Sequence, residues 1–302
     1  MVTPELAARL IGGQFPGVAA RRVELLATGW DNTAFLVDDR WLFRFPRREV
    51  ALPGIRREIA LLPWLAGRLP LAVPAPEFIG EQSEAFGWPF WGARLIKGKE
   101  LPEAGLPDEQ RGGVARSVGE FLSALHDPAL AAAAIERAGG DLPTDPMRRG
   151  SPARRAQMAR PVLDRLASDA GMHVDPEIER LLDRAASAPD PAPAGLVLTH
   201  GDLHPRHVLV DDAGAAAGVI DWGDVCVADP AVDLFIAYSG FAGAQRAGLL
   251  AAYGRPVGAD RELAARTCAL SVTLALVDYA IDEHRPVLLT ECMAGLRRIV
   301  SG

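Results

Sequence analysis

Short apolar runs fill the first hundred residues of the chain, and longer helical periodicities fill most of the rest. Apolar, β-branched and aromatic residues dominate three stretches that we expect to be strands, at 22–27, 33–37 and 41–45. Asp38 and Asp39 between the last two are a hairpin turn signal. Apolar residues recur at helical spacing over 53–68, and two more strands fit 77–80 and 88–96. These patterns predict a β-rich unit with one long helix.

The pattern changes at 97–102, where charged residues, Gly98 and Pro102 interrupt it and predict a hinge. After it, helical spacing dominates, and we expect helices near 108–126, 152–170, 175–188, 230–240, 243–253, 260–283 and 286–300. Short strands at 196–199, 207–210 and 217–221 interrupt the helices, and the Pro-rich segment 189–195 is predicted to be a loop. The prediction is an α+β fold of two lobes, with a small β-rich lobe over 1–97 and a larger, mainly helical lobe over 98–302.

Composition narrows the choice of function classes. The chain has 302 residues, is 49% hydrophobic and carries a net charge of −7, so it can build a large core. The acidic balance argues against a nucleic-acid partner, which usually meets a basic face. Cys226, Cys268 and Cys292 show no metal-ligand spacing, and a reducing compartment suits them.

The termini and apolar runs bear on location. The N-terminus lacks the basic start and long apolar run of a signal peptide, and Thr3 and Pro4 instead predict a capped helix. We found no uninterrupted apolar run of membrane-spanning length, the richest candidate being 267–281. We therefore expect a cytoplasmic protein without a membrane partner. Oligomeric state has no signal, and we expect a monomer without excluding a dimer.

The most informative stretch runs from 196 to 234. An apolar strand leads into His200-Gly201-Asp202, His207 follows five residues later, and Asp221 ends the next hairpin. Potential bases and metal ligands thus gather at the ends of short strands. Phosphoryl transfer needs such a set, because one carboxylate must accept a hydroxyl proton and another must hold magnesium on the phosphate oxygens.

At this stretch the sequence resembles the aminoglycoside phosphotransferase family, kinase-like enzymes that modify antibiotics. The resemblance rests on HGDLHPRH at 200–207, IDW at 220–222 and GDVCVADPAVDL at 223–234. Further upstream, TGWDNTAFLVDDRWLFRFPRR (28–48) and RREIALLPWLAGRLPLAVPAPEFIG (56–80) are similar to the nucleotide loop, third strand, next helix and fourth strand of 2″-aminoglycoside and macrolide phosphotransferases. The similarity covers most of 20–235, whereas 235–302 matches in helical character alone.

The resemblance implies a role for each matching residue. It makes Asp202 the catalytic base and Asp221 a magnesium ligand, and it places His207 where many members have a metal-binding asparagine. Imidazole is a less natural magnesium ligand than an amide oxygen, so the number of bound metals stays open. The resemblance also implies that the phosphoryl donor is ATP or GTP and that the acceptor is a hydroxyl of a small molecule.

The nucleotide side of the site is also implied by the resemblance. Arg44 stands where the family usually has a strand lysine that contacts phosphates, with Glu58 as its ion-pair partner. The turn over the phosphates contains Gly29, Asp31 and Asn32. Backbone groups near Arg94 and Ile96 would hold the nucleotide base.

Two rival functions stay open at this point. One is a zinc enzyme, because His200, His204 and His207 lie close together in sequence, although Pro205 prevents a helix from aligning them. The other is a kinase-like protein that binds nucleotide without transferring phosphate, suggested by the unusual Arg44 and His207.

The acceptor is open within the kinase reading. A polycationic aminoglycoside needs carboxylates, for which the candidates are Asp224, Asp278, Asp282 and Glu283. A macrolide would instead use the apolar side chains of 231–300 with one carboxylate for its amine. A cellular metabolite is a third choice.

Overall fold

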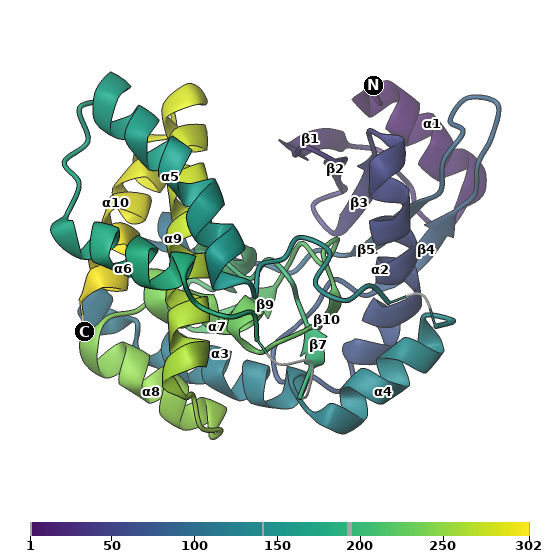
Figure 1. Cartoon of the computed structure of the whole chain (residues 1–302). Coiled ribbons are helices and arrows are strands. Elements are labelled where there is room, and N and C mark those ends of the chain that lie inside the picture. The colour runs from purple at the N-terminus through teal and green to yellow at the C-terminus, as the bar shows by residue number, and fades with distance from the viewer. Residues whose placement is uncertain (1, 141, 192–194, 302) are drawn as a thin grey trace.

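The computed structural model describes residues 2–140, 142–191 and 195–301. The fold is α+β, as predicted, with a β-sheet region formed early in the chain and a helical region formed later (Figure 1). The five strands of the main sheet are antiparallel and lie in the order β1-β2-β3-β5-β4. They are β1 (Val23–Thr28), β2 (Asn32–Val37), β3 (Trp41–Pro46), β4 (Pro76–Gly80) and β5 (Phe90–Arg94).

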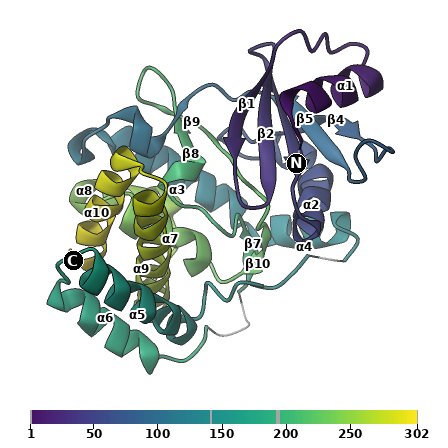
Figure 2. The same ribbon diagram turned by 90° about the horizontal axis from the view of Figure 1, so that it is seen from above.

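Two helices cover opposite faces of this sheet. Successive strand residues point to opposite faces, and on β5 Phe90 belongs to the cluster that contains α1 (Pro4–Gln14), whereas Trp91 packs with α2 (Leu52–Leu65). Figure 2 shows the sheet between the two helices. Phe43 and Phe45 of β3 point to the α1 side, so Arg44 between them points to the α2 side. The prediction that Thr3 caps α1 is confirmed, since its hydroxyl accepts from the Leu6 amide.

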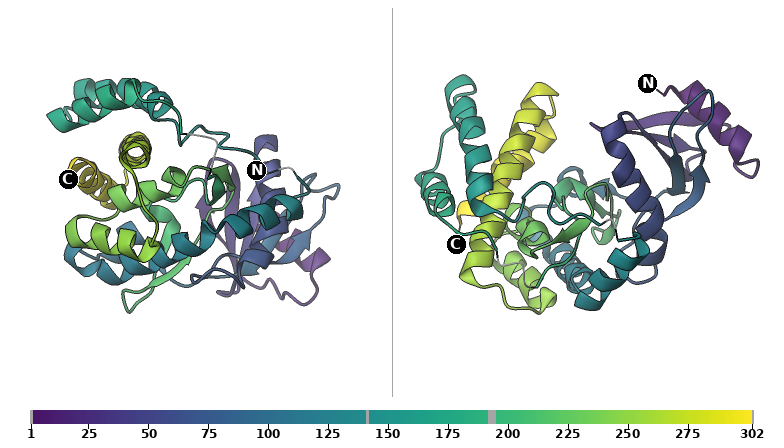
Figure 3. Two further views of the ribbon diagram at one scale, coloured as in Figure 1. Left: turned by 60° about the horizontal axis from the view of Figure 1, so that its bottom comes forward. Right: turned by 45° about the vertical axis from the view of Figure 1, so that its right-hand side comes forward.

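The second region is a bundle of helices. Its members are α3 (Gly112–Leu125), α4 (Pro128–Arg137), α5 (Pro152–Asp169), α6 (Pro176–Ala186), α7 (Ala231–Ser239), α8 (Gly243–Tyr253), α9 (Ala259–Asp282) and α10 (Pro286–Val300). α7 is buried along its whole length and packs against α9. Figure 3 shows α5 and α6 on the outer side of α9 and α10. α9 is long and apolar enough to cross a membrane, but 61% of its apolar window is buried within the protein, as in a core helix.

Short paired strands hold the loops that lie between the two regions. β7 (Val197–Thr199) pairs with β10 (Cys226–Ala228), and β8 (Val208–Val210) lies between β9 (Ala216–Val219) and β6 (Lys99–Glu100). One-turn 3₁₀ helices flank them: η1 (Glu49–Ala51), η2 (Leu101–Ala104), η3 (Asp108–Gln110) and η4 (Pro205–His207).

Several sequence predictions of the elements were wrong in detail. The segment 97–102 is more than a hinge, because Lys99 and Glu100 form β6 and pair with β8. The strand expected at 217–221 ends at Val219, which leaves Asp221 in a loop. The expected helix 108–126 is broken at Arg111, and α4 and β10 were not predicted. Residues 192–194 of the expected loop 189–195 lie outside the described residues.

α2 approaches the loop after Asp221 very closely. A Cβ atom on Gly54 would lie 2.9 Å from the Gly223 carbonyl oxygen, so only glycine permits the contact. On the next turn, Arg57 Nη2 donates to the same oxygen at 3.0 Å. The helix that covers the sheet is thereby attached to the segment that carries Asp221.

Candidate active site

The loop that carries Asp202 is held in place by hydrogen bonds to a side chain of α7. The carboxylate of Asp233 accepts hydrogen bonds from the backbone amides of His200 (2.7 Å) and Gly201 (3.0 Å), and it is fully buried. His126 Nε2 lies 3.2 Å from the same carboxylate. Gly201 has φ 89°, and a Cβ there would lie 2.2 Å from the Asp224 carbonyl oxygen. The chain can turn at this point only because the residue has no side chain.

Asp202 presents its carboxylate at the end of this loop. Its side chain is 22% exposed, so a substrate can reach it. One oxygen lies 3.0 Å from Arg149 Nη2, and the other lies 3.7 Å from His204 Nε2. An accessible carboxylate on a fixed backbone is the arrangement that a general base requires.

His207 and Asp221 face one another beside Asp202. His207 Nδ1 donates to the Asp202 carbonyl oxygen at 2.8 Å, so its Nε2 carries the lone pair. That nitrogen lies 3.5 Å from Asp221 Oδ2. Adjacent ligands of an octahedral magnesium ion are roughly 3 Å apart. These two side chains therefore fit a shared divalent cation.

Asp221 adopts a left-handed backbone conformation, with φ 65°. The loop is held there because His200 Nε2 donates to the Ile220 carbonyl oxygen at 2.9 Å. Desolvation would raise the pKa of Asp221, but the charge of the Arg44 guanidinium and its hydrogen bond outweigh that effect and hold the pKa well below its usual value. The carboxylate is thus ionised and able to bind a cation at neutral pH.

Arg44 joins the sheet to this loop. Its Nη1 lies 3.2 Å from Glu58 Oε1 on α2, and its Nη2 lies 2.5 Å from Asp221 Oδ1. Glu58 is 1% exposed, and its other oxygen accepts from Trp91 Nε1 at 3.0 Å. Burial raises the pKa of Glu58 and Arg44 opposes that rise. With its amide oxygen turned toward Arg44, Asn32 accepts from Nη2 (2.9 Å) and Nε (3.2 Å).

The remaining predicted nucleotide contacts lie along the edge of the same region. Gly29 N donates to the Asn32 carbonyl oxygen at 2.9 Å, and Asp31 accepts from Arg48 Nε at 3.0 Å, so the turn is closed on itself. Arg94 ends β5, with its side chain on Glu77 and over the Trp41 ring. Ile96 follows β5 and lies against Gly218 of β9.

Arg149 was missed by the sequence analysis. Its Nη1 donates at 2.7 Å to both the Gly201 carbonyl oxygen and Asp224 Oδ2, while its Nη2 pairs with Asp202. It comes from the loop before α5, in which Asp145 accepts from the amides of Arg149 and Gly150. No periodicity or motif marks this loop. The signal that was available is the Arg148-Arg149-Gly150 turn after a proline-rich stretch, which is weak.

The four expected acceptor contacts lie in two places. Asp224 is at the site, held by Arg149. Asp278 is on α9, where both its oxygens accept from Arg165 of α5. Asp282 and Glu283 are exposed at the end of α9. The structure therefore brings Asp224 to Asp202 through Arg149, and it assigns Asp278 to the contact between α5 and α9.

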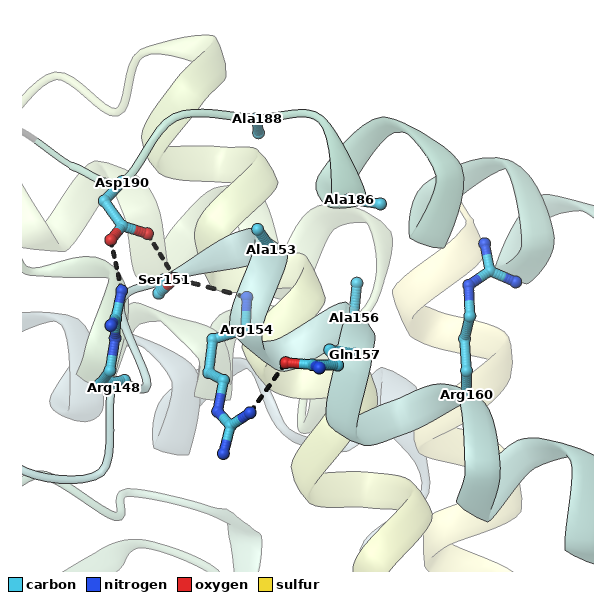
Figure 4. A pocket seen from close by; sticks show the side chains of 10 residues that line it. All are labelled: Arg148, Ser151, Ala153, Arg154, Ala156, Gln157, Arg160, Ala186, Ala188 and Asp190. Carbon is cyan, nitrogen blue, oxygen red and sulfur yellow. Dashed lines mark hydrogen bonds and ion pairs between the residues drawn. The ribbon is translucent and has the colours of Figure 1, made fainter.

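A hollow of about 860 Å³ lies on the neighbouring surface (Figure 4). It is bordered by the start of α5 and the end of α6. Its polar groups largely bind one another: Arg148 pairs with Asp190 at 2.6 Å, Ser151 donates to Asp190, and Arg154 donates to Gln157. Asp202, His207 and Asp221 do not line this hollow. Arg148, which does, is adjacent in sequence to Arg149.

Residues 22–266 match the model of a phosphotransferase enzyme family, which is most of the chain. The chain belongs to this family. The resemblance stated from the sequence is confirmed, and the protein is a phosphotransferase of the kinase type that acts on hydroxyl groups.

Solved structures agree with this fold. The GDP and kanamycin complex of the aminoglycoside phosphotransferase APH(2″)-IIIa aligns with TM-score 0.67 and 24% identity over 97% of each chain. A type I macrolide 2′-phosphotransferase aligns with TM-score 0.59 and 25% identity over 98% of each chain. The macrolide 2′-phosphotransferase MphH from Brachybacterium faecium, as apoenzyme, aligns with TM-score 0.56 and 26% identity over 91% of each. These matches support the two-lobed kinase-like fold.

A curated relative matches a shorter part. The uncharacterised protein YcbJ of Bacillus subtilis (strain 168) is 43% identical over 61 residues, so the match spans about a fifth of that protein and a fifth of this chain. Because the chain belongs to a phosphotransferase family, the zinc enzyme is no longer a rival for its main function.

Proposed function

We propose that this phosphotransferase moves the terminal phosphoryl group of ATP or GTP onto a hydroxyl of an antibiotic, in the cytoplasm. The observation that carries the proposal is the geometry around Asp202. Its carboxylate is accessible, and His207 and Asp221 lie beside it, 3.5 Å from one another. The Arg44–Glu58 pair connects this group to the sheet. We assign residues 1–97 to nucleotide binding and 98–302 to catalysis and acceptor binding.

Asp202 accepts the proton of the acceptor hydroxyl while the hydroxyl oxygen approaches the terminal phosphorus of the donor. The loose transition state needs little chemistry from the protein beyond position and charge. Arg44 binds the donor phosphates and is held by Glu58. His207 and Asp221 would hold Mg²⁺, which supplies charge neutralisation on the phosphate oxygens when bound. Gly29, Asp31 and Asn32 lie over the phosphates, and the backbone near Arg94 and Ile96 holds the base.

Between the two antibiotic classes, the charges near Asp202 favour an acceptor with few cationic groups. Asp224 and Asp202 already share Arg149, and Asp278 is paired with Arg165. A polycationic aminoglycoside would have to compete for these carboxylates with Arg149, which is largely buried, and with the exposed Arg165. A macrolide, which carries one amine, needs one carboxylate. We therefore place macrolides ahead of aminoglycosides as the acceptor class.

The test is incubation of the protein with Mg²⁺, ATP or GTP and a panel of macrolides and aminoglycosides, followed by mass spectrometry. We expect one class to gain a phosphate with the wild type. Asp202→Ala should lower turnover by at least about 10²-fold while nucleotide binding persists. Wild-type turnover in that variant would contradict the role of Asp202. Nucleotide binding without transfer to any acceptor would support the non-catalytic alternative.

A further inference from the structure

His204 is a buried imidazole whose ring nitrogens have no hydrogen-bond partner among the described residues. The residue is 5% exposed, and its Nδ1 is buried and unsatisfied. Its Nε2 faces the Asp202 carboxylate at 3.7 Å, beyond hydrogen-bond distance. Buried polar atoms in native proteins nearly always have a partner, so an unpaired imidazole next to the reaction centre requires an explanation.

The 3₁₀ turn η4 places His204 over His207. Side chains three residues apart in a 3₁₀ helix lie one above the other, and the two ring centroids are 3.8 Å apart with a tilt of 31°. One ligand atom each from Asp202, His204 and His207 lies within 4.8 Å of the others. This cluster differs from the set of His200, His204 and His207 that the sequence suggested. The ring of His200 donates to the Ile220 carbonyl oxygen, and Asp202 is the third member of the cluster instead.

We propose that Asp202, His204 and His207 form a binding site for a transition-metal ion of the zinc type, and that its occupancy blocks phosphoryl transfer. Zinc prefers imidazole nitrogen and carboxylate oxygen, at about 2.0–2.2 Å. Three such groups with one open position for water match the ligand set of a catalytic zinc site, and magnesium binds such a set less well because it prefers oxygen ligands. The lone pair of an imidazole nitrogen lies in the plane of its ring. Because the rings of His204 and His207 are nearly stacked, one of them must turn before both lone pairs can point at the same ion.

The hydrogen bonding of His207 and the exposure of Asp202 suit metal binding. His207 keeps its proton on Nδ1, where it donates to the Asp202 carbonyl oxygen, and offers Nε2. An ion can enter because Asp202 is 22% exposed.

The inhibitory part of this inference rests on the proposed function, in which Asp202 accepts the hydroxyl proton. A carboxylate that ligates zinc is a weaker base, because the nearby cation favours its ionised form, and the ion occupies the space through which the hydroxyl would approach. The same ion would take His207 away from Asp221, so it would compete with the catalytic Mg²⁺. Zinc would thus lower turnover, and raising Mg²⁺ would partly restore it.

The binding test uses the full chain without nucleotide and isothermal titration with ZnCl₂. We expect one zinc per wild-type chain and at least about 10-fold weaker binding in His204→Phe, because losing a direct ligand costs at least as much as losing an outer-shell partner. Phenylalanine keeps the ring stacked on His207. The matched control is His173→Phe, which removes an exposed histidine and should bind as the wild type does.

Equal zinc affinity in wild type and His204→Phe would overturn the site. If His204→Phe unfolds, Co²⁺ added to the wild type decides instead: visible absorption bands of a low-symmetry nitrogen and oxygen site support the proposal, and their absence overturns it. Calorimetry and Co²⁺ spectra need no acceptor, so failure of the antibiotic assay leaves this test intact. Where transfer is measurable, a wild-type rate insensitive to bound zinc would overturn the inhibition.

Discussion

Two arginines bridge carboxylates on either side of the site, and they do so in different settings. Arg44 lies between Glu58 and Asp221, on the side that we propose binds nucleotide. Arg149 lies between Asp202 and Asp224, on the side that we propose binds the acceptor. Arg44 projects from the central strand of a regular sheet, whereas Arg149 projects from a loop in which Asp145 and Arg148 have positive φ angles.

The two bridges also differ in what they bury. Glu58 is 1% exposed, so Arg44 neutralises a charge that water cannot reach. The partners of Arg149 are both partly exposed, and water shares in their solvation. The nucleotide-side bridge is therefore expected to stabilise the fold and to bind phosphate, while the acceptor-side bridge mainly orients the base. Substitutions can separate the two roles.

The largest effect is expected from Arg44→Ala. Removing this cation leaves Glu58 buried without its partner, which costs about 3–5 kcal/mol in comparable buried pairs. We expect a lower free energy of unfolding in urea and weaker nucleotide binding by calorimetry. The double variant Arg44→Met with Glu58→Gln is the control, because it removes both charges together. It should recover much of the stability and none of the nucleotide affinity; full recovery of affinity would contradict the phosphate role.

A smaller effect is expected from Arg149→Ala. Without this side chain the Asp202 carboxylate loses one of its two fixed neighbours, and a base displaced by about 1 Å costs up to roughly 10²-fold in rate. We expect kcat to fall by about 10-fold or more with nucleotide affinity unchanged. Arg149→Lys should recover part of the rate, and added guanidinium should recover part of it in Arg149→Ala. A loss confined to the KM for the acceptor would show that Arg149 binds substrate instead.

Asp224→Asn tests whether the carboxylate of Asp224 contacts the acceptor. The change keeps the size of the side chain and an acceptor oxygen for Arg149, but it removes one negative charge. We expect a change of a few-fold, about 1 kcal/mol or less for a partly exposed pair. If the acceptor carries one amine held here, its KM should rise while the KM for nucleotide stays constant. An unchanged acceptor KM would place the amine elsewhere.

The smallest effect concerns stability in acid. The pKa of Asp221 is lower in the folded protein than its usual value of 3.8, so it contributes stability that is present above that value and lost as pH falls below it. Its side chain is 46% exposed, so screening by water keeps the contribution near 1 kcal/mol or less. The difference in unfolding free energy between wild type and Asp221→Asn should be constant from pH 7 to 5 and shrink below pH 4. A difference that grew in acid would contradict this sign.

Regular structure explains which parts could be predicted from the sequence. The strand expected at 41–45 and the helix expected at 53–68 are present as β3 and α2. The pair between Arg44 and Glu58 was implied by the family resemblance, and the two side chains lie 3.2 Å apart. The HGD and IDW segments marked Asp202, His207 and Asp221, which do lie together. Their catalytic and metal roles stay predictions.

Irregular backbone explains what was missed. Arg149 reaches Asp202 across a gap of more than fifty residues, from a loop shaped by hydrogen bonds to Asp145 and to β10. β6 and β10 are two and three residues long, too short for any period. Asp278 was expected to face an acceptor because it shares a helix face with Asp282, but α5 covers that position and supplies Arg165. Local patterns do not contain such partners.

The contact of Gly54 with Gly223 has a mechanical consequence. Together with Arg57 and Arg44, it ties the helix beneath the sheet to the segment that bears Asp221. A swing of the sheet region away from the helical region would have to break all three attachments at once. Release of spent nucleotide would then have to proceed without a wide swing of the sheet region.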